Sequence, residues 1–253
     1  MTRGRIGAVT FDLWDCLFRD DSDEPKRVAR GLAPKKQARR DLIFEALNKH
    51  DPIDRAASDL AFNVTEAAFN KVWHDEFVTW RVAERLQVLL TGLGRTLPED
   101  TLQPLIEAYE TMELDPMPDP APGAVEALKA LHGNYPLAII SDAVYTPGWA
   151  LRQFLERAGM IDCFDHFVFS DELGHSKPHP AVFASVAARY NTDVTGIVHI
   201  GDRPHNDIGG AHAVGARAVL LTVVKQRPLD GHEPDAVCDD YAKLPDVLAQ
   251  LEA

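Results

Sequence analysis

The sequence predicts an α/β protein, a doubly wound parallel sheet that carries an all-helical insertion near its N-terminus. Two observations lead to this fold class. From Met117 onward, short apolar runs alternate with segments of helical periodicity, which is the pattern of successive βαβ units. Before that point, helical periodicity dominates residues 20–115 and follows a single apolar run. We therefore expect residues 1–19 and 116–253 to form the α/β core and residues 20–115 to form a helical cap domain.

Strands of the core are expected as short apolar runs, because helices cover both faces of such a sheet. At least five runs qualify, at residues 8–11, 137–141, 167–170, 196–202 and 218–224. Helices are expected at residues 123–132, 148–158, 180–190, 208–214 and 244–251. Pro180 suits the first turn of its helix, and Gly215 marks the end of another.

The region 20–115 shows helical periodicity at residues 36–48, 65–90 and 102–112. Thr65 is expected to cap the start of a helix that carries Trp73 and Trp80, seven residues apart and packed inside the cap. A charged loop at residues 19–25 and a proline-rich connector at residues 115–123 mark its two boundaries.

Composition limits the classes of function. The formal charge of −13 disfavours binding to nucleic acid or to anionic membranes, and it requires local cations at any site for an anion. No apolar stretch is long enough to span a bilayer. Because a predicted strand begins within a few residues of Met1, we expect no signal peptide. Three widely spaced cysteines suit a reducing compartment, so we expect a cytoplasmic protein. A homodimer is left open, because the sequence does not define the oligomeric state.

Polar residues follow the first two predicted core strands directly. Asp12 comes after the run Ala8-Val9-Thr10-Phe11, and Ser141 with Asp142 ends the next strand. The carboxyl ends of parallel strands meet at one edge, which is where open α/β sheets hold ligands. A carboxylate there can act as a covalent nucleophile. A hydroxyl with adjacent backbone N–H groups can hold phosphate or carboxylate oxygens.

Two further segments complete this set. Lys177, in Ser-Lys-Pro-His-Pro, stands just before a predicted helix, where its ammonium would neutralise Asp12 and the charge of a reacting group. In Gly-Asp-Arg-Pro-His-Asn-Asp, Asp202 ends the fourth predicted strand and Asp207 lies in the segment after it. Mg²⁺ prefers oxygen ligands and usually takes one or two carboxylates, so both are candidate metal ligands.

The four segments resemble, in order and spacing, the motifs of the haloacid dehalogenase-like (HAD) hydrolase superfamily, in its helical-cap (C1) type. Its first motif is usually Asp-x-Asp-x-Thr, and its later motifs resemble Lys-Pro-x-Pro and Gly-Asp-x-x-x-Asn-Asp. The resemblance implies a hydrolase with Asp12 as nucleophile. It also implies catalytic roles for Ser141 and Lys177, and substrate contacts by Ser141, Asp142 and Trp14.

The same resemblance implies a Mg²⁺ cofactor, held by the side chains of Asp12, Asp202 and Asp207 and by the backbone carbonyl of Trp14. The favoured reaction is therefore Mg²⁺-dependent hydrolysis of a small phosphorylated metabolite, a small anionic substrate.

The first motif departs from the family pattern at two positions. Trp14 stands where phosphatase members have the Asp that serves as general acid and base, a role typically worth about 10²–10⁴-fold in rate. Asp15 and His205 are candidates to replace it, although an extended segment would turn Asp15 away from the site. Cys16 replaces the usual Thr and is expected to pack as a small apolar side chain.

Three alternatives stay open at this stage. In 2-haloacid dehalogenases an aromatic residue stands at the position of Trp14, but these enzymes need no metal, and Phe183 stands where their Tyr is expected. Phosphonoacetaldehyde hydrolases form an imine through a cap lysine, and the region 20–115 contains Lys26, Lys35, Lys36, Lys49 and Lys71. The third alternative is a catalytically silent HAD protein that binds an anionic ligand.

Overall fold

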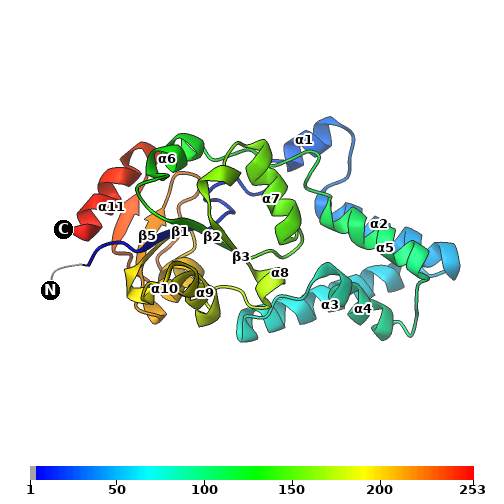
Figure 1. Ribbon diagram of the computed structural model, residues 1–253. Helices are drawn as coiled ribbons and strands as arrows, with labels where there is room; N and C mark the ends of the chain where they lie inside the picture. The colour runs from blue at the N-terminus through cyan, green and yellow to red at the C-terminus, as the bar shows by residue number, and fades with distance from the viewer. Residues whose placement is uncertain (1–3) are drawn as a thin grey trace.

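The computed structural model describes residues 4–253, and its centre is a six-stranded, fully parallel sheet (Figure 1). The strands lie in the order β3-β2-β1-β4-β5-β6. They span β1 Ala8–Phe11, β2 Leu137–Ser141, β3 His166–Phe169, β4 Ile197–Gly201, β5 Arg217–Leu221 and β6 Ala236–Cys238. The chain builds outward from β1 to β3 and then returns to β4 on the other side of β1. This reversal creates the crevice in which such sheets hold ligands.

Strand β1 is buried along its whole length, since helices cover both faces of the sheet. Val9 and Phe11 point into a cluster with three helices, α6 Ala124–Leu131, α7 Gly148–Arg157 and α11 Leu244–Glu252. Ala8 points to the opposite face, against α9 Pro180–Tyr190 and α10 Gly210–Ala213. The predicted doubly wound α/β class is therefore confirmed.

The register places the carboxyl ends of three central strands side by side. Phe11 of β1 lies opposite Ile139 of β2 and Ile200 of β4. The residues that follow, Asp12, Ser141 and Asp202, therefore leave the sheet at the same edge.

Five helices lie between β1 and α6 and form the helical insertion. They are α1 Glu24–Ala29, α2 Lys35–His50, α3 Arg55–Glu76, α4 Val82–Gly92 and α5 Glu99–Glu110. Helices α2 to α5 project to one side of the sheet (Figure 1) and share a hydrophobic cluster of their own, which includes Ile43, Phe62, Leu86 and Leu105. The domain boundaries at residues 20 and 115 stay a prediction.

The single helical pattern expected over residues 65–90 is wrong, because it covers parts of two helices. Helix α3 begins ten residues earlier, so Thr65 is buried in its middle and does not cap it. The chain leaves α3 at Phe77, whose φ of 55° is left-handed, and Val78 then pairs with His175 of the core. This contact with the core, which the periodicity does not encode, separates Trp73 from Trp80.

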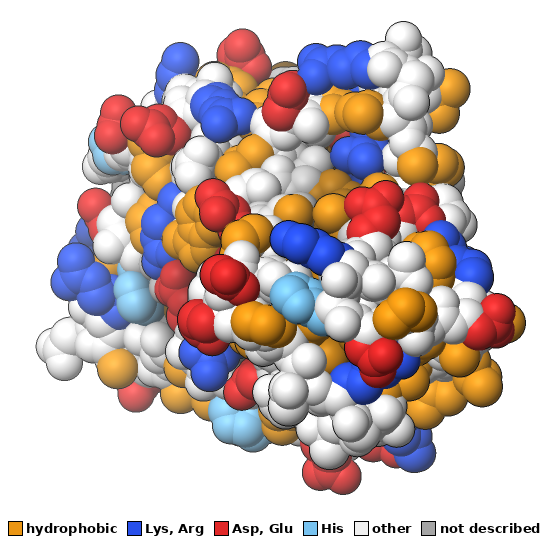
Figure 2. Space-filling view, turned by 90° about the vertical axis from the view of Figure 1, so that its right-hand side faces the viewer, with side chains coloured by type: hydrophobic (Ala, Val, Ile, Leu, Met, Phe, Trp, Pro, Cys, Tyr) orange, Lys and Arg blue, Asp and Glu red, His pale blue; other side chains and the backbone are white. Residues whose placement is uncertain are grey.

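Three short elements were not expected. Helix α1 lies partly in the segment predicted as a charged loop, helix α8 Ser170–Leu173 begins at the last residue of the strand expected at 167–170, and β6 adds a three-residue edge strand. None of the helices in residues 4–253 is long and apolar enough to cross a membrane. Acidic and basic side chains are interspersed on the face shown in Figure 2. The three cysteines are free and buried, as expected for packed thiols.

Candidate active site

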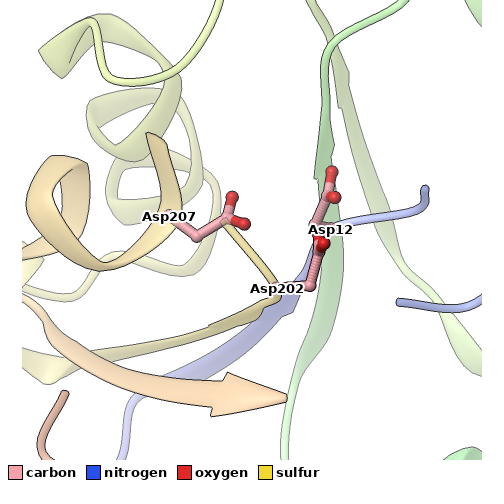
Figure 3. A group of neighbouring side chains, drawn as sticks. All are labelled: Asp12, Asp202 and Asp207. Atoms are coloured by element: carbon pink, nitrogen blue, oxygen red, sulfur yellow. The ribbon is translucent and has the colours of Figure 1, made fainter. Parts of the chain in front are cut away.

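Three buried carboxylates meet at the carboxyl edge of the sheet (Figure 3). Asp12 follows β1, Asp202 follows β4, and Asp207 lies in the helical turn at residues 204–209. One oxygen from each lies within 4.8 Å of the others. Such a group of hard oxygen donors is the chemistry that Mg²⁺ requires.

Backbone geometry fixes two of these acids. The N–H of Asp12 donates to the carbonyl of Ile200 at 2.8 Å, which extends the β1–β4 pairing to the carboxyl edge of the sheet. The N–H of Arg203 donates to Oδ2 of Asp207 at 2.8 Å. A Cβ at Gly201 would lie 2.3 Å from Cγ of Asp207, so only glycine allows this carboxylate so close to the strand end.

Lys177 is the buried cation of the site. Its Nζ lies 2.6 Å from Oδ1 of Asp12 and 2.7 Å from Oδ1 of Asp207, and it donates to the carbonyl of Ile140 at 3.0 Å. Burial alone would lower the pKa of Lys177, but the carboxylates of Asp12, Asp207 and Asp142 hold it above its usual value. Lys177 is therefore charged at neutral pH.

The same ammonium acts differently on its two acidic neighbours. Burial raises the pKa of Asp12, and Lys177 works against that shift. Burial would also raise the pKa of Asp207, but Lys177 and His199 together hold it below its usual value. Asp207 is therefore a permanent negative charge beneath the site.

His199, on β4, supports Asp207 from inside the core. Its Nε2 lies 3.1 Å from Oδ1 of Asp207, and its Nδ1 lies 2.8 Å from Oγ1 of Thr10. Burial lowers the pKa of His199, which keeps the ring neutral. With a neutral ring, the arrangement assigns the proton to Nε2, which donates to the carboxylate, while Nδ1 accepts from the hydroxyl.

Asp202 has one engaged and one free oxygen. Its Oδ2 accepts from Nε of Arg227 at 2.5 Å, and Arg227 also binds Asp15 at 3.0 Å. Its Oδ1 is buried and has no hydrogen-bond partner within the described residues. Burial, with the charges of Asp12 and Asp207, raises the pKa of Asp202 to about 7. An orphaned buried oxygen beside two other carboxylates fits a cation ligand.

Ser141 and Asp142 lie at the end of β2. The Ser141 hydroxyl is buried and finds no partner in the part of the chain that the structure describes. Asp142 is fully engaged, because its Oδ1 accepts from the N–H of Lys177 at 2.9 Å and its Oδ2 from Asn206 at 3.4 Å. Ser141 is thus free to bind a ligand, whereas Asp142 positions the lysine segment.

A pocket of about 230 Å³ opens above these residues, between the sheet edge and the helical insertion. Its floor includes Asp12 and Lys177, and Trp14 forms part of its wall while packing edge-on against Phe154. Trp73 also lines it, so the expectation that Trp73 packs only inside the cap is wrong. Further lining residues come from several elements and were not predicted: Asp20, Asn70, Glu113, Tyr145, Thr146 and Arg203.

Asp15 and His205 do not line this pocket. Asp15 accepts hydrogen bonds from Arg227 and from the N–H of Asp20, and His205 is exposed, with its ring against His232. Arg203 could have been predicted as a site residue, because it lies within the metal motif identified from the sequence. Arg227 could not have been predicted as one, since its loop after β5 has no motif that links it to the site.

Comparison with known proteins identifies the family. The model of the haloacid dehalogenase-like hydrolases matches residues 6–215, which is most of the chain. The chain belongs to the haloacid dehalogenase-like hydrolases. The resemblance predicted from its motifs is confirmed, and so is the expectation of a hydrolase.

Among relatives of this HAD hydrolase, the glyceraldehyde 3-phosphate phosphatase of Pyrococcus furiosus is 26% identical over 249 residues, which cover 98% of this chain and 94% of that protein. The protein of the same name from Pyrococcus abyssi is 31% identical over 132 residues, and there the match spans only 52% of this chain and 54% of the relative.

Solved structures show the same fold. A 2-haloacid dehalogenase from Pseudomonas syringae has a TM-score of 0.65 at 23% identity, covering 96% of this chain and 98% of its own. An HAD phosphatase from Thermococcus onnurineus has a TM-score of 0.62 at 20% identity, covering 95% and 97%. The 2-haloacid dehalogenase and the HAD phosphatase, which represent two of the branches considered from the sequence, therefore share this architecture.

Proposed function

We propose that this HAD hydrolase is a Mg²⁺-dependent phosphatase that acts on a small phosphorylated metabolite. The observation that carries the proposal is the convergence of Asp12, Asp202 and Asp207, with a free, buried oxygen on Asp202. The relatives named as glyceraldehyde 3-phosphate phosphatases support it.

The metal would be held by Asp12, Asp202 and Asp207 and by the backbone carbonyl of Trp14. When bound, Mg²⁺ supplies positive charge that stabilises the oxygens of a transferring phosphoryl group. The three buried carboxylates are paired with two cations, Lys177 and Arg227, and Arg227 also binds Asp15. The negative charge that remains is one that a divalent ion would offset.

Asp12, Ser141 and Lys177 would each have a separate role at the phosphoryl group. Asp12 attacks the phosphorus, and the bond to the leaving oxygen breaks, which leaves an aspartyl phosphate that water later hydrolyses. The unpartnered hydroxyl of Ser141 would bind one phosphoryl oxygen. The ammonium of Lys177 would stabilise the charge on another while it orients Asp12.

The helical insertion would act as the cap of this site. Asn70 and Trp73 of α3 line the same pocket as Asp12, so the insertion already forms one wall around the nucleophile. Movement of these helices would admit the substrate, exclude water and select the leaving group. We also propose a cytoplasmic location, which the three free cysteines favour.

The alternatives receive less support from the side chains. A dehalogenase needs no metal, yet both acids of the metal motif are present and buried. An imine requires a neutral lysine amine, but Lys35 is buried against Asp23 and Glu113. Burial alone would lower the pKa of Lys35, and these carboxylates hold it above its usual value.

The test measures phosphate release from p-nitrophenyl phosphate with Mg²⁺, beside chloride release from 2-chloropropionate. We expect phosphate release that EDTA abolishes and that Asp12→Asn removes. The matched control Asp162→Asn, on the surface η1 turn at Ile161–Cys163, should keep the parental rate. Chloride release without metal, or neither activity, would overturn the proposal.

A further inference from the structure

The proposed phosphatase lacks a general acid at its usual place, because Trp14 carries no ionisable group. The two candidates identified from the sequence, Asp15 and His205, do not line the pocket that contains Asp12. The Asp15 carboxylate is bound by the N–H of Asp20 at 3.1 Å, by Arg227 at 3.0 Å and by Lys225 at 3.4 Å. His205 packs against His232, outside the pocket that contains Asp12.

Four carboxylates line the pocket in the described part of the chain, and three of them are engaged. Asp12 is the nucleophile, and Asp142 binds the backbone of Lys177 and the amide of Asn206. Glu113 binds Lys35 at 2.7 Å and the hydroxyl of Thr146. The fourth is Asp20.

The carboxyl group of Asp20 belongs to a residue that lines the pocket, and one of its oxygens is available to bind a substrate. Asp20 lines the pocket together with Asp12 and Trp14. Its Oδ1 accepts the N–H of Asp21 at 3.0 Å, and its Oδ2 accepts no hydrogen bond from any residue in the range 4–253. The residue as a whole is exposed, so this oxygen can meet a substrate that enters the pocket.

The backbone of Asp20 is tied to the metal-binding acids. Its N–H donates to Oδ1 of Asp15, the other oxygen of Asp15 binds Arg227, and Arg227 binds Asp202. These contacts join the loop after β1 to the carboxyl end of β4. The backbone of Asp20 is therefore held in place beside the pocket that Asp12 also lines.

The charges around Asp20 favour its protonated form. The pocket walls desolvate its carboxyl group, and the carboxylates of Asp21, Glu113 and Asp15 add repulsion, while the ammonium of Lys35 works against them. Together these groups raise the pKa of Asp20 to about 6. An acid whose pKa lies near neutrality suits proton transfer in both directions.

We propose that Asp20 is the general acid and base of this enzyme, in place of the residue lost at Trp14. The inference rests on the proposed phosphatase function. As Asp12 attacks the phosphorus, the bond to the leaving oxygen breaks and the Asp20 proton passes to that oxygen, which departs as an alcohol. The Asp20 carboxylate then takes a proton from the water that attacks the aspartyl phosphate. Phosphate leaves, and Asp12 returns as a carboxylate.

The test compares two leaving groups of similar shape in the full-length enzyme with Mg²⁺. Phenyl phosphate releases a strongly basic phenolate that needs a proton, whereas p-nitrophenyl phosphate releases a weakly basic one. We expect Asp20→Asn to lower kcat/KM on phenyl phosphate by about 10²-fold or more and on p-nitrophenyl phosphate by less than about tenfold. The matched control Asp162→Asn, an exposed acid on the η1 turn that does not line the pocket, should keep parental values on both substrates.

The pH profile gives a second readout. In the parent, kcat/KM on phenyl phosphate should fall as pH rises past about 6, since Asp20 loses the proton that it donates. That fall should be absent in Asp20→Asn. Equal losses on both substrates, or an unchanged pH profile, would overturn the role of Asp20 while leaving the phosphatase function intact. A parent inactive on both substrates would overturn the proposed function and this inference together.

Discussion

The ammonium of Lys177 lies 2.6 Å from Oδ1 of Asp12, and this pair is buried at the carboxyl edge of the sheet. The same ammonium lies 2.7 Å from Oδ1 of Asp207. Two carboxylates this close and this deeply buried would repel each other strongly without a cation between them. Lys177 therefore serves folding as well as the chemistry proposed for the site.

Replacing Lys177 with methionine keeps most of its volume and removes its charge. We expect kcat to fall by about 10²-fold or more, because a preorganised positive charge is lost. The free energy of unfolding should fall by about 3–5 kcal/mol, since the side chain is 2% exposed and its loss leaves two buried carboxylates without the cation between them. Denaturant unfolding and steady-state kinetics measure the two effects.

The control for this change is Lys36→Met, which removes an exposed lysine of the helical insertion. It should match the parent in both measurements. A Lys177→Met variant as stable as the parent would contradict the role of the ammonium between the two acids.

Ser141→Ala separates ligand binding from folding. The Ser141 hydroxyl has no protein partner among residues 4–253, so its loss should change the free energy of unfolding by less than about 1 kcal/mol. A hydrogen bond to a charged phosphoryl oxygen is worth about 1.5–3 kcal/mol, so kcat/KM should fall about tenfold or more.

Ser170→Ala is the matched control at the same edge of the sheet. Its hydroxyl accepts the N–H of Ala143 at 2.9 Å, and its removal should cost about 1–3 kcal/mol of stability. If Ser141→Ala lost stability and kept its activity, the assignment of Ser141 to the ligand would be wrong.

The sequence predicted well those parts that depend on local patterns. Helix α9 matches its expected bounds of residues 180–190, because Pro180 begins it and Asn191 ends it in a left-handed conformation. The strand ends carrying Asp12, Ser141 and Asp202 were placed correctly, since parallel strands buried on both faces read as apolar runs.

Features that depend on contacts distant in sequence were not predictable. The end of α3 is set by the pairing of Val78 with His175, about a hundred residues away. Arg227 reaches Asp202 and Asp15 from a loop without a motif. Asp20 lies in a loop that reads only as charged, and its place in the pocket follows from the backbone after β1.

Mg²⁺ should stabilise the protein through Asp202. At a concentration of 100 times Kd, binding adds about 2.7 kcal/mol to the free energy of unfolding. Thermal unfolding should therefore show a Tm several degrees higher with Mg²⁺ than with EDTA. In Asp202→Asn this increase should disappear. Asp193→Asn should retain it, because Asp193 is an exposed acid just before the η2 turn at Val194–Gly196.

Without metal, Asp202→Asn should unfold at no lower temperature than the parent. Burial and the charges of Asp12 and Asp207 disfavour the ionised carboxyl of Asp202 even beside Arg227, and they raise its pKa to about 7. A neutral amide at this position therefore removes an unfavourable charge. An equal Mg²⁺ shift in the variant and the parent would remove Asp202 from the set of metal ligands.

The neutral ring of His199 predicts how stability depends on pH. Burial lowers its pKa below the ordinary 6.5, so on unfolding at lower pH the ring takes up a proton that the folded protein excludes. Its contribution is therefore fully present above pH 6.5 and is lost as pH falls below that value, by up to about 1.4 kcal/mol for each pH unit. The carboxyl of Asp207, whose pKa is lowered, adds a loss only below its ordinary value of 3.8.

His199→Gln removes the contribution of the His199 ring to the pH dependence of stability. The variant should be less stable than the parent by a constant amount above pH 7, because the bonds to Thr10 and Asp207 are weakened. Between pH 6.5 and pH 4 the two curves should approach each other, since only the parent loses stability by protonation of this ring. Urea unfolding at intervals of half a pH unit measures both curves. Parallel curves across this range would contradict the lowered pKa of His199 and the neutral ring in the folded protein.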